Sequence, residues 1–486
     1  MESLVFYGWR SARSICLAVF LLPAAAVPQV VPPALPGQVP ISVQNPVYGS
    51  VQETKPTPEV LSVTFLGAID RALRQNLSAL LSEYNTLEAR GQKWQELSAL
   101  LPNVSGATQE TDQKLSLIAL GFGKFPPGIF GNAKLPAVIG PFSYFDVRAT
   151  ATQRVFDWKA IQQYRSSVAS ENAARFDLKN ARELVVLATG NAYLQAVAGA
   201  ARVDTAEAQQ ETAKALYDKA VAQQQAGVAP AIDTLRAQVE YQSRRQQLIA
   251  ATNDFAKQKL TLARIVGLAP GQEFTLADKA PYEPFPIPDL EASLQRAYTL
   301  RADYQVARNR LLAAQLARNA ASAGRFPTFD VEGDYGEIGA TPASVLPTYH
   351  VVGTLNIPIF QGNKVHADVL KAEAAVRRAE AQLADVRGLI DQEMRNALLD
   401  LKSSSDQVEV AQSSVDLAEQ ALAQSRDRFS AGVTDNLEVV QAQQAVAAAH
   451  ENLISSLYLN NLAKVAYAQA LGRAEDGVRE YLMRGK

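Results

Sequence analysis

An internal repeat constrains the fold of this chain more than any other feature of its sequence. A tripeptide Ala-Gly-Val near the middle recurs close to the C-terminus, and residues on both sides of it match as well. The matched pairs are Pro102 with Pro327, Phe156 with Phe360, Gly227 with Gly432, Asp233 with Glu438, and Gly267 with Gly472. The spacing is 225 for the first pair and about 205 afterwards, so the first copy holds an insertion before Phe156. A repeat of this length excludes a solenoid of short units and predicts a pseudo-symmetric body.

The N-terminus is typical of a secretory signal. Arg10 and Arg13 precede an apolar stretch from Ile15 to Leu22, and small residues at 24–26 provide a cleavage site. An uncleaved anchor is the alternative, but the stretch is short for a membrane span. We therefore predict a signal peptide over 1–26. Residues 27–60 are rich in proline and predict an extended arm.

Each copy contains a pair of segments in which apolar and polar residues alternate. In the second copy Phe329, Val331 and Tyr335 share one face, and the acids between them share the other. This period predicts strands, and their length fits strands that cross a membrane. A soluble hairpin packed on helices is the alternative. Because known membrane barrels begin at about eight strands, four strands per chain would need several chains to close one barrel.

A proline-free helical stretch follows each hairpin, over about 157–226 and 362–431. At 1.5 Å per residue, seventy residues give a rod of roughly 105 Å. Val408, Val415 and Leu422 recur by sevens, which predicts coiled-coil packing. Beyond the N-terminus the sequence has no run of about 18 apolar residues, so we expect no transmembrane helix. A soluble coiled-coil stalk would explain the rods but would leave the hairpins without a role.

The turns between paired rods share Ala-Gly-Val and then differ, with Ala229-Pro230 in the first copy and Thr434-Asp435 in the second. Gly227 and Gly432 suit a helix C-terminus with positive φ. Asp435 is placed to cap the next helix, with Glu438 three residues on as the partner of a capping box. Taken singly, each acid has this structural explanation.

With these motifs in this order, the chain resembles the TolC-type outer-membrane factor family of Gram-negative bacteria from about Val60 onwards. The motifs that carry the resemblance are the two tip turns, with Glu438-Val439-Val440 and Asp233-Thr234-Leu235 after them, and Ile357-Pro358-Ile359-Phe360-Gln361-Gly362. The resemblance implies a mixed α/β membrane protein that forms a homotrimer. Three chains would share a 12-stranded transmembrane β-barrel, four strands per chain, continued by a long periplasmic α-helical barrel.

The same resemblance implies partners and a site. The partners are outer-membrane lipid, a periplasmic adaptor (membrane fusion) protein and, indirectly, an inner-membrane transporter of RND or ABC type. The candidates for the entrance or gate are Glu438, Asp233 and Asp435, and those for the periplasmic tip turn and adaptor contact are Gly227, Val228, Gly432, Val433 and Thr434. Phe429 stands where relatives often have a tyrosine, and Thr434 where some have a basic residue.

The expected division of the chain follows from the repeat. It comprises a signal peptide at 1–26, an arm at 27–60, a first repeat at 61–287, a second repeat at 288–474 and a C-terminal tail at 475–486. Each repeat is expected to open with one helical segment, near 64–101 and 288–325, which ends before Pro102 or Pro327. β-Hairpins at about 103–155 and 328–360 and long helical hairpins at about 157–267 and 362–472 then follow.

Composition argues against other classes of function. A net charge of −2 gives no basic surface for nucleic acid. The three histidines are far apart, and no phosphate loop or zinc spacing is present, so we expect no enzyme, cofactor or metal. The function expected is an outer-membrane channel of a tripartite efflux or type I secretion system. The alternative is a periplasmic or cell-surface coiled-coil structural protein without channel activity.

Overall fold

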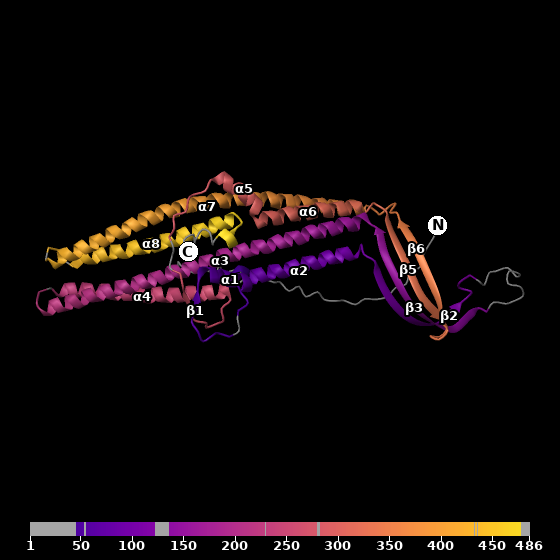
Figure 1. The fold of residues 1–486 in the computed structure, drawn as a ribbon, viewed down its shortest axis with the longest axis horizontal. Coiled ribbons are helices and arrows are strands. Elements are labelled where there is room, and N and C mark those ends of the chain that lie inside the picture. Colours follow the sequence, from indigo (N-terminus) through magenta and orange to yellow (C-terminus); the bar gives the residue numbers. More distant parts are fainter. Residues whose placement is uncertain are drawn as a thin grey trace, which may run out of the picture. The chain divides into compact units, whose positions relative to one another are not determined.

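The two copies of the repeat have the same order of elements in the computed structural model, which describes residues 45–52, 55–121, 136–228, 230–278, 282–431, 433–434 and 436–477. All of them belong to one unit, Val43–Lys486. The first copy contains β1 (Leu61–Val63), α1 (Phe65–Gln75), α2 (Leu77–Ser98), β2 (Asn103–Ser116), β3 (Val138–Phe156), α3 (Trp158–Gln225), α4 (Ala231–Val266) and β4 (Phe274–Leu276) (Figure 1). The second contains α5 (Leu290–Leu300), α6 (Ala302–Ala323), β5 (Thr328–Gly339), β6 (Leu346–Asn356), α7 (Lys364–Ser430) and α8 (Asn436–Ala470). A short 3₁₀ turn, Pro46–Tyr48, precedes them.

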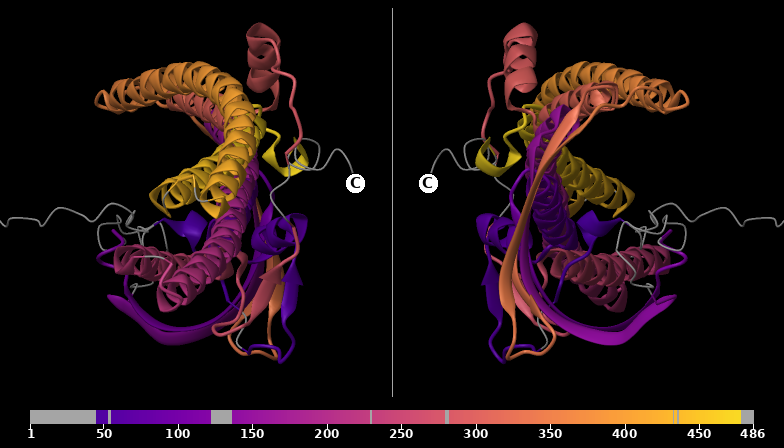
Figure 2. Two further views of the ribbon diagram at one scale, coloured as in Figure 1. Left: turned by 90° about the vertical axis from the view of Figure 1, so that its left-hand side faces the viewer. Right: turned by 90° about the vertical axis from the view of Figure 1, so that its right-hand side faces the viewer.

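The four long strands form one antiparallel sheet in the order β2-β3-β5-β6. The central pair, β3 with β5, joins the two copies, and the sheet curves when it is viewed along the helices (Figure 2). β2 and β6 are edge strands of 14 and 11 residues with no neighbour among the described residues. The small parallel pair of β1 with β4 forms a separate sheet.

The two faces of the large sheet differ in chemistry. Tyr335 pairs with Tyr349 across β5 and β6, and their side chains are 62% and 79% exposed. On the other face an ion pair joins Arg148 of β3 to Asp334 of β5, and Arg148 also donates to Thr348 Oγ1 at 3.1 Å. The predicted alternation is therefore present in space, with an apolar face and a charged face.

Strand β6 is shorter than the sequence pattern indicated. Its last residue is Asn356, so Ile357 and Ile359 lie beyond it, and Ile359 is 95% exposed. Pro358 has no backbone N–H to continue the ladder, which explains the end of the strand.

The helices continue the order of the strands. α2 and α6 lead into β2 and β5, whereas β3 and β6 lead into α3 and α7, and the four helices pack side by side in the order α2-α3-α6-α7. Farther from the sheet, α3 packs on α4 and on α8, and α8 packs on α7. Four helices thus lie side by side near the sheet, and four lie together farther from it. At 68 and 67 residues, α3 and α7 are each about 100 Å long.

The heptad columns predicted for the rods lie in the interface between helices. Val408, Ala411 and Val415 of α7 are buried, and so are Ala213 and Ala220 of α3. The many alanines let neighbouring helices approach closely.

The first helical segment of each copy is two helices, where the sequence predicted one. The chain is extended at Asn76, with φ −68° and ψ 134°, and again at Arg301, with φ −64° and ψ 125°. These positions are 225 residues apart, as are Pro102 and Pro327. Asn76 Oδ1 accepts from Ser78 N and caps α2. Arg301 is held by Asp303 and Glu393. At the first break a side chain thus replaces a backbone acceptor, whereas at the second the buried Arg301 side chain ties the joint to Asp303 and to α7.

The main hydrophobic core lies midway along the unit, where α1 and the β1–β4 pair cover α3, α4 and α8. Among the described helices only α3 has an 18-residue window apolar enough to cross a membrane, with mean hydropathy 1.4, and 67% of that window is buried. The expectation that no such stretch exists was wrong. Its burial in this core gives the window a structural explanation.

Candidate functional site

The turn from α3 to α4 is built by a glycine with positive φ. Gly227 has φ +71°, and its N–H donates to Gln224 O at 3.0 Å while Val228 N donates to Gln223 O at 3.0 Å. This pair of bonds is the Schellman motif, which ends a helix by satisfying its last carbonyls. The motif leaves the Val228 side chain 75% exposed at the tip.

The turn from α7 to α8 follows the same pattern. Val433 N donates to Arg428 O at 3.0 Å, the equivalent of the bond from Val228 to Gln223. Val433 is 70% exposed. Gly432 and Asp435 lie outside the described residues, so the capping role predicted for Asp435 is not visible. The two tips therefore each present an exposed valine on a matching backbone turn.

Glu438 lies in the first turn of α8 and faces the end of α7. Its carboxylate accepts from the Thr434 hydroxyl and, at 3.5 Å, from Ser425 Oγ, and it lies 3.6 Å from an Arg428 guanidinium nitrogen. The side chain is 33% exposed. The partners described for this carboxylate are side chains, and the Asp435 N–H that would complete a capping box lies outside the described residues.

Asp233, the counterpart of Glu438, has different surroundings. Its carboxylate lies 3.6 Å from Arg236 on the same helix, and its side chain is 21% exposed. The position equivalent to Arg236 is Gln441, and that equivalent to Arg428 is Gln223. Within the described ranges Asp233 and Glu438 do not contact each other. Each copy thus fixes its acid with a different arginine.

Two tip contacts were not predicted from the sequence. One is Arg428, whose place in the last turn of α7 is favourable for a cation and was a usable signal. The other joins the copies, because Lys219 of α3 lies 5.6 Å from the centre of the Phe429 ring of α7. A cation over an aromatic ring is attracted by the ring, so this contact ties α3 to α7 near the tip. Nothing in the local sequence links residues that far apart.

The site has the chemistry of an ionic and apolar surface. In the part of the chain that the structure describes, no group of three or more His, Cys, Asp or Glu side chains is placed to hold a metal ion. Carboxylates near a helical tip attract cations, and exposed valines favour contact with another apolar surface.

Comparisons with known proteins identify relatives over most of the chain. The model of the outer membrane efflux protein family matches residues 69–268 and 293–473. The alkaline protease secretion protein AprF of Pseudomonas aeruginosa is 26% identical over 322 residues, which span 63% of this chain and 65% of AprF. The pyoverdine export outer membrane protein OpmQ of the same species is 24% identical over 70% of this chain and 72% of OpmQ. The alignment therefore spans just under two thirds of AprF.

A solved structure shares the fold. The Campylobacter jejuni CmeC outer membrane channel superposes with a TM-score of 0.73 over 88% of this chain and 92% of CmeC, at 17% identity. The likeness therefore covers both the sheet and the long helices.

Proposed function

Because the chain belongs to the outer membrane efflux protein family, we propose that it is the outer-membrane channel of a tripartite efflux or type I secretion system. In this proposal three identical chains share one barrel of twelve strands, four from each chain. The helices of the three copies continue the barrel as a tube across the periplasm. The family and the structural neighbour CmeC are transport channels and not enzymes, which favours this function over a structural coiled coil.

The single observation that carries the proposal is the four-stranded sheet, whose edge strands β2 and β6 have no neighbour in the part of the chain that the structure describes. An unpaired edge inside lipid would leave backbone N–H and C=O groups without partners, so only a closed barrel is stable there. The exposed tyrosines and valines of one face suit lipid, and the Arg148–Asp334 pair of the other suits a water-filled lumen. Pairing β6 of one chain with β2 of the next chain leaves no strand edge unpaired.

The helices support a tube of matching size. Four helices per chain at each level give twelve in a trimer, the same number as the strands. The far tips would then carry the exposed Val228 and Val433 to a periplasmic adaptor. A passive duct has no energy source of its own, so we propose that an inner-membrane transporter of RND or ABC type powers export through the adaptor.

The N-terminal segment belongs to the same proposal. Residues 1–26 are proposed as a signal peptide that is removed during export, and 27–60 as an arm that joins the body. Its described part is attached there, because Asn76 Nδ2 donates to Val47 O at 2.7 Å and Val51 N donates to Gln75 O at 2.9 Å.

Mass measurement in detergent and conductance across planar bilayers test the proposal. We expect a trimer that conducts ions. A water-soluble monomer without membrane affinity or conductance would contradict it.

Two proline variants test the closed edge. Consecutive residues of an antiparallel strand direct their N–H groups to opposite sides. One of Val351 and Val352 therefore bonds β5, and the other faces the open edge of β6. If β6 pairs with β2 of a neighbouring chain, Val351→Pro and Val352→Pro should each lower the yield of trimer. If only one of them does, the edge of β6 is free and the shared barrel is wrong.

A further inference from the structure

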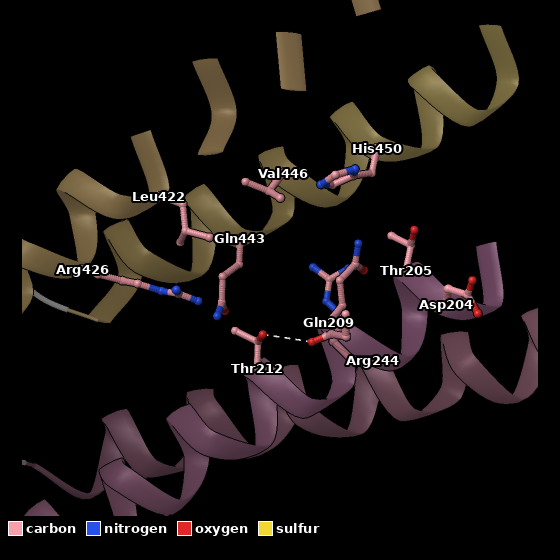
Figure 3. A pocket seen from close by; sticks show the side chains of 11 residues that line it. Asp204, Thr205, Gln209, Thr212, Arg244, Leu422, Arg426, Gln443, Val446 and His450 are labelled. Atoms are coloured by element: carbon pink, nitrogen blue, oxygen red, sulfur yellow. Dashed lines mark hydrogen bonds between the residues drawn. The ribbon is translucent and has the colours of Figure 1, made fainter. Parts of the chain in front are cut away.

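A cavity lies between the helix pairs of the two copies, on the side of the core nearer the tips (Figure 3). Its volume is about 350 Å³, within the range of small-molecule sites. α3 lines one side through Gln209 and Thr212, and α7 and α8 line the other through Leu422, Arg426, Gln443 and Val446. The cavity is therefore lined by residues about 200 positions apart in the sequence.

Gln443 provides an unused hydrogen-bond acceptor in this cavity. The residue is 8% exposed, and its Oε1 has no hydrogen-bond partner among the described residues. Figure 3 shows the side chain extending from α8 toward Thr212. The Thr212 hydroxyl cannot donate to it, because that hydroxyl donates to Ala208 O at 2.9 Å. A buried acceptor without a donor is costly, so a bound donor would be stabilised here.

Arg426 provides a solvent-exposed cation that lines the cavity. The described part of the chain gives its guanidinium no ion-pair partner, whereas Arg244 in the same cavity is paired with Glu240 at 2.7 Å. Asp204 lies at the opposite end of the cavity from Arg426 in Figure 3. His450 has its own partner, since its Nε2 is 3.2 Å from Glu419. The Arg426 end is therefore suited to an anion.

Leu422 and Val446 supply the apolar surface between these polar groups. Leu422 is one helical turn from Arg426 on the same face of α7, and Val446 is one turn from Gln443 on α8. A carbon ring or chain held by Arg426 and Gln443 would cover both side chains.

We propose that this cavity binds a small hydroxylated aromatic carboxylate. The carboxylate pairs with the Arg426 guanidinium, the hydroxyl donates to Gln443 Oε1, and the ring packs on Leu422 and Val446. The carboxylate matches the unpaired cation, the hydroxyl matches the unpaired acceptor, and the ring matches the apolar wall. The ligand joins the two helix pairs of one chain. The proposal does not depend on channel activity.

Calorimetric titration of the mature chain in detergent with 3-hydroxybenzoate tests this site. We expect saturable binding with one ligand per chain. Benzoate lacks the donor and 3-hydroxybenzamide lacks the charge, so each should bind about tenfold more weakly. These comparisons need no variant and stand even where a substitution impairs folding.

Variants then assign the contacts. Gln443→Leu should make 3-hydroxybenzoate bind no better than benzoate, and Arg426→Gln should weaken 3-hydroxybenzoate about tenfold. Gln238→Leu, at the exposed equivalent position of the first copy, and Arg245→Gln, an exposed arginine outside the cavity, should leave binding unchanged. A cavity filled only by water would give no saturable heat with any of the three probes. That result, or equal binding by all four variants, would overturn the proposal.

Discussion

The Glu438 carboxylate has three neighbours, and together they determine whether it acts as a charge at the entrance. Thr434 and Ser425 donate hydrogen bonds to it, and Arg428 lies 3.6 Å away with a side chain that is 57% exposed. An exposed ion pair is weak, so Arg428 neutralises the carboxylate only in part. In the proposed trimer three such carboxylates lie around one axis, where they repel one another and attract cations.

Glu438→Gln separates a charged entrance from a purely structural side chain. Glutamine retains an acceptor for Thr434 but removes the charge, so we expect weaker cation preference and block by divalent cations about fivefold weaker, or about 1 kcal/mol. Single-channel recordings measure both. Asp233→Asn should have a smaller effect, because Asp233 is less exposed and paired with Arg236. Unchanged selectivity and block in an intact Glu438→Gln trimer would make this acid structural.

Glu171 is a buried carboxylate held by several cations near the sheet. Its side chain is 3% exposed and lies 2.6 Å from Lys93 and 2.6 Å from Arg175. The hydrogen bond from Lys93, followed by that from Arg175, lowers the pKa of Glu171 below its ordinary value of 4.5. A lowered pKa in the folded state stabilises the fold above the ordinary value, and this stability is lost as the pH falls through the lowered one.

We therefore expect Glu171→Gln to destabilise the protein by about 3 kcal/mol at pH 7 and by much less at pH 3. Denaturant unfolding followed by circular dichroism at both pH values measures the difference. Glu88→Gln, an exposed change on α2, serves as the control and should have no effect at either pH. An equal loss for Glu171→Gln at pH 7 and pH 3 would show that its charge does not stabilise the fold.

At the scale of elements, the second long helix of each copy, α4 or α8, ends against the break between two shorter helices, which we call the joint. Gly267 closes α4 against Gln75, next to the break at Asn76, and Gly472 closes α8 against Arg301. Both glycines have φ +74°. In both copies the glycine thus packs against the joint, on a side chain at Gly267 and on the Arg301 backbone at Gly472.

Two glycine variants separate backbone strain from close packing. A Cβ at Gly472 would lie 2.7 Å from Arg301 Cα, whereas a Cβ at Gly227, with a similar φ of +71°, would meet open space. Gly227→Ala should therefore cost about 1 kcal/mol, and Gly472→Ala about 1–3 kcal/mol more. Chemical denaturation of the two variants gives the comparison. Equal costs would mean that the backbone contact at Arg301 relaxes freely.

At the scale of the whole molecule, the barrel proposal fixes the direction of the chain in the membrane. The connection between β2 and β3 is longer than that between β5 and β6, and long loops of membrane barrels lie on the outer side. The prediction that the β2–β3 connection narrows the mouth of the channel falls mainly on 122–135, which lie outside the described residues. The turns from α3 to α4 and from α7 to α8 lie at the other end of the long helices (Figure 1).

Peptide tags test this topology. Tags inserted at Asn132 and at Pro342 should be labelled on intact cells, and a tag at Val228 only after the outer membrane is permeabilised. Labelling in the opposite order would reverse the topology and place the helices outside the cell.

The sequence by itself determined the repeat, the long rods and the two-sided strands. Each depends on local periodicity: sevens such as Val408 and Val415 bury one stripe of a helix, and twos such as Val331 and Gly333 place one face of a strand on one side. The two-copy architecture expected from these patterns is confirmed by the likeness to CmeC. The exposed valines and the positive φ at Gly227 also follow from a short motif.

Only the tertiary structure decided which distant residues meet. The helix breaks at Asn76 and Arg301 depend on polar partners in other elements, and the apolar window of α3 became a core because α1 and α4 cover it. Arg428 beside Glu438, Lys219 over Phe429 and the cavity around Gln443 all join separate helices. Such contacts depend on how rods some 100 Å long lie against one another, and packing over that distance is set by the sum of many alanine-sized contacts rather than by any local pattern.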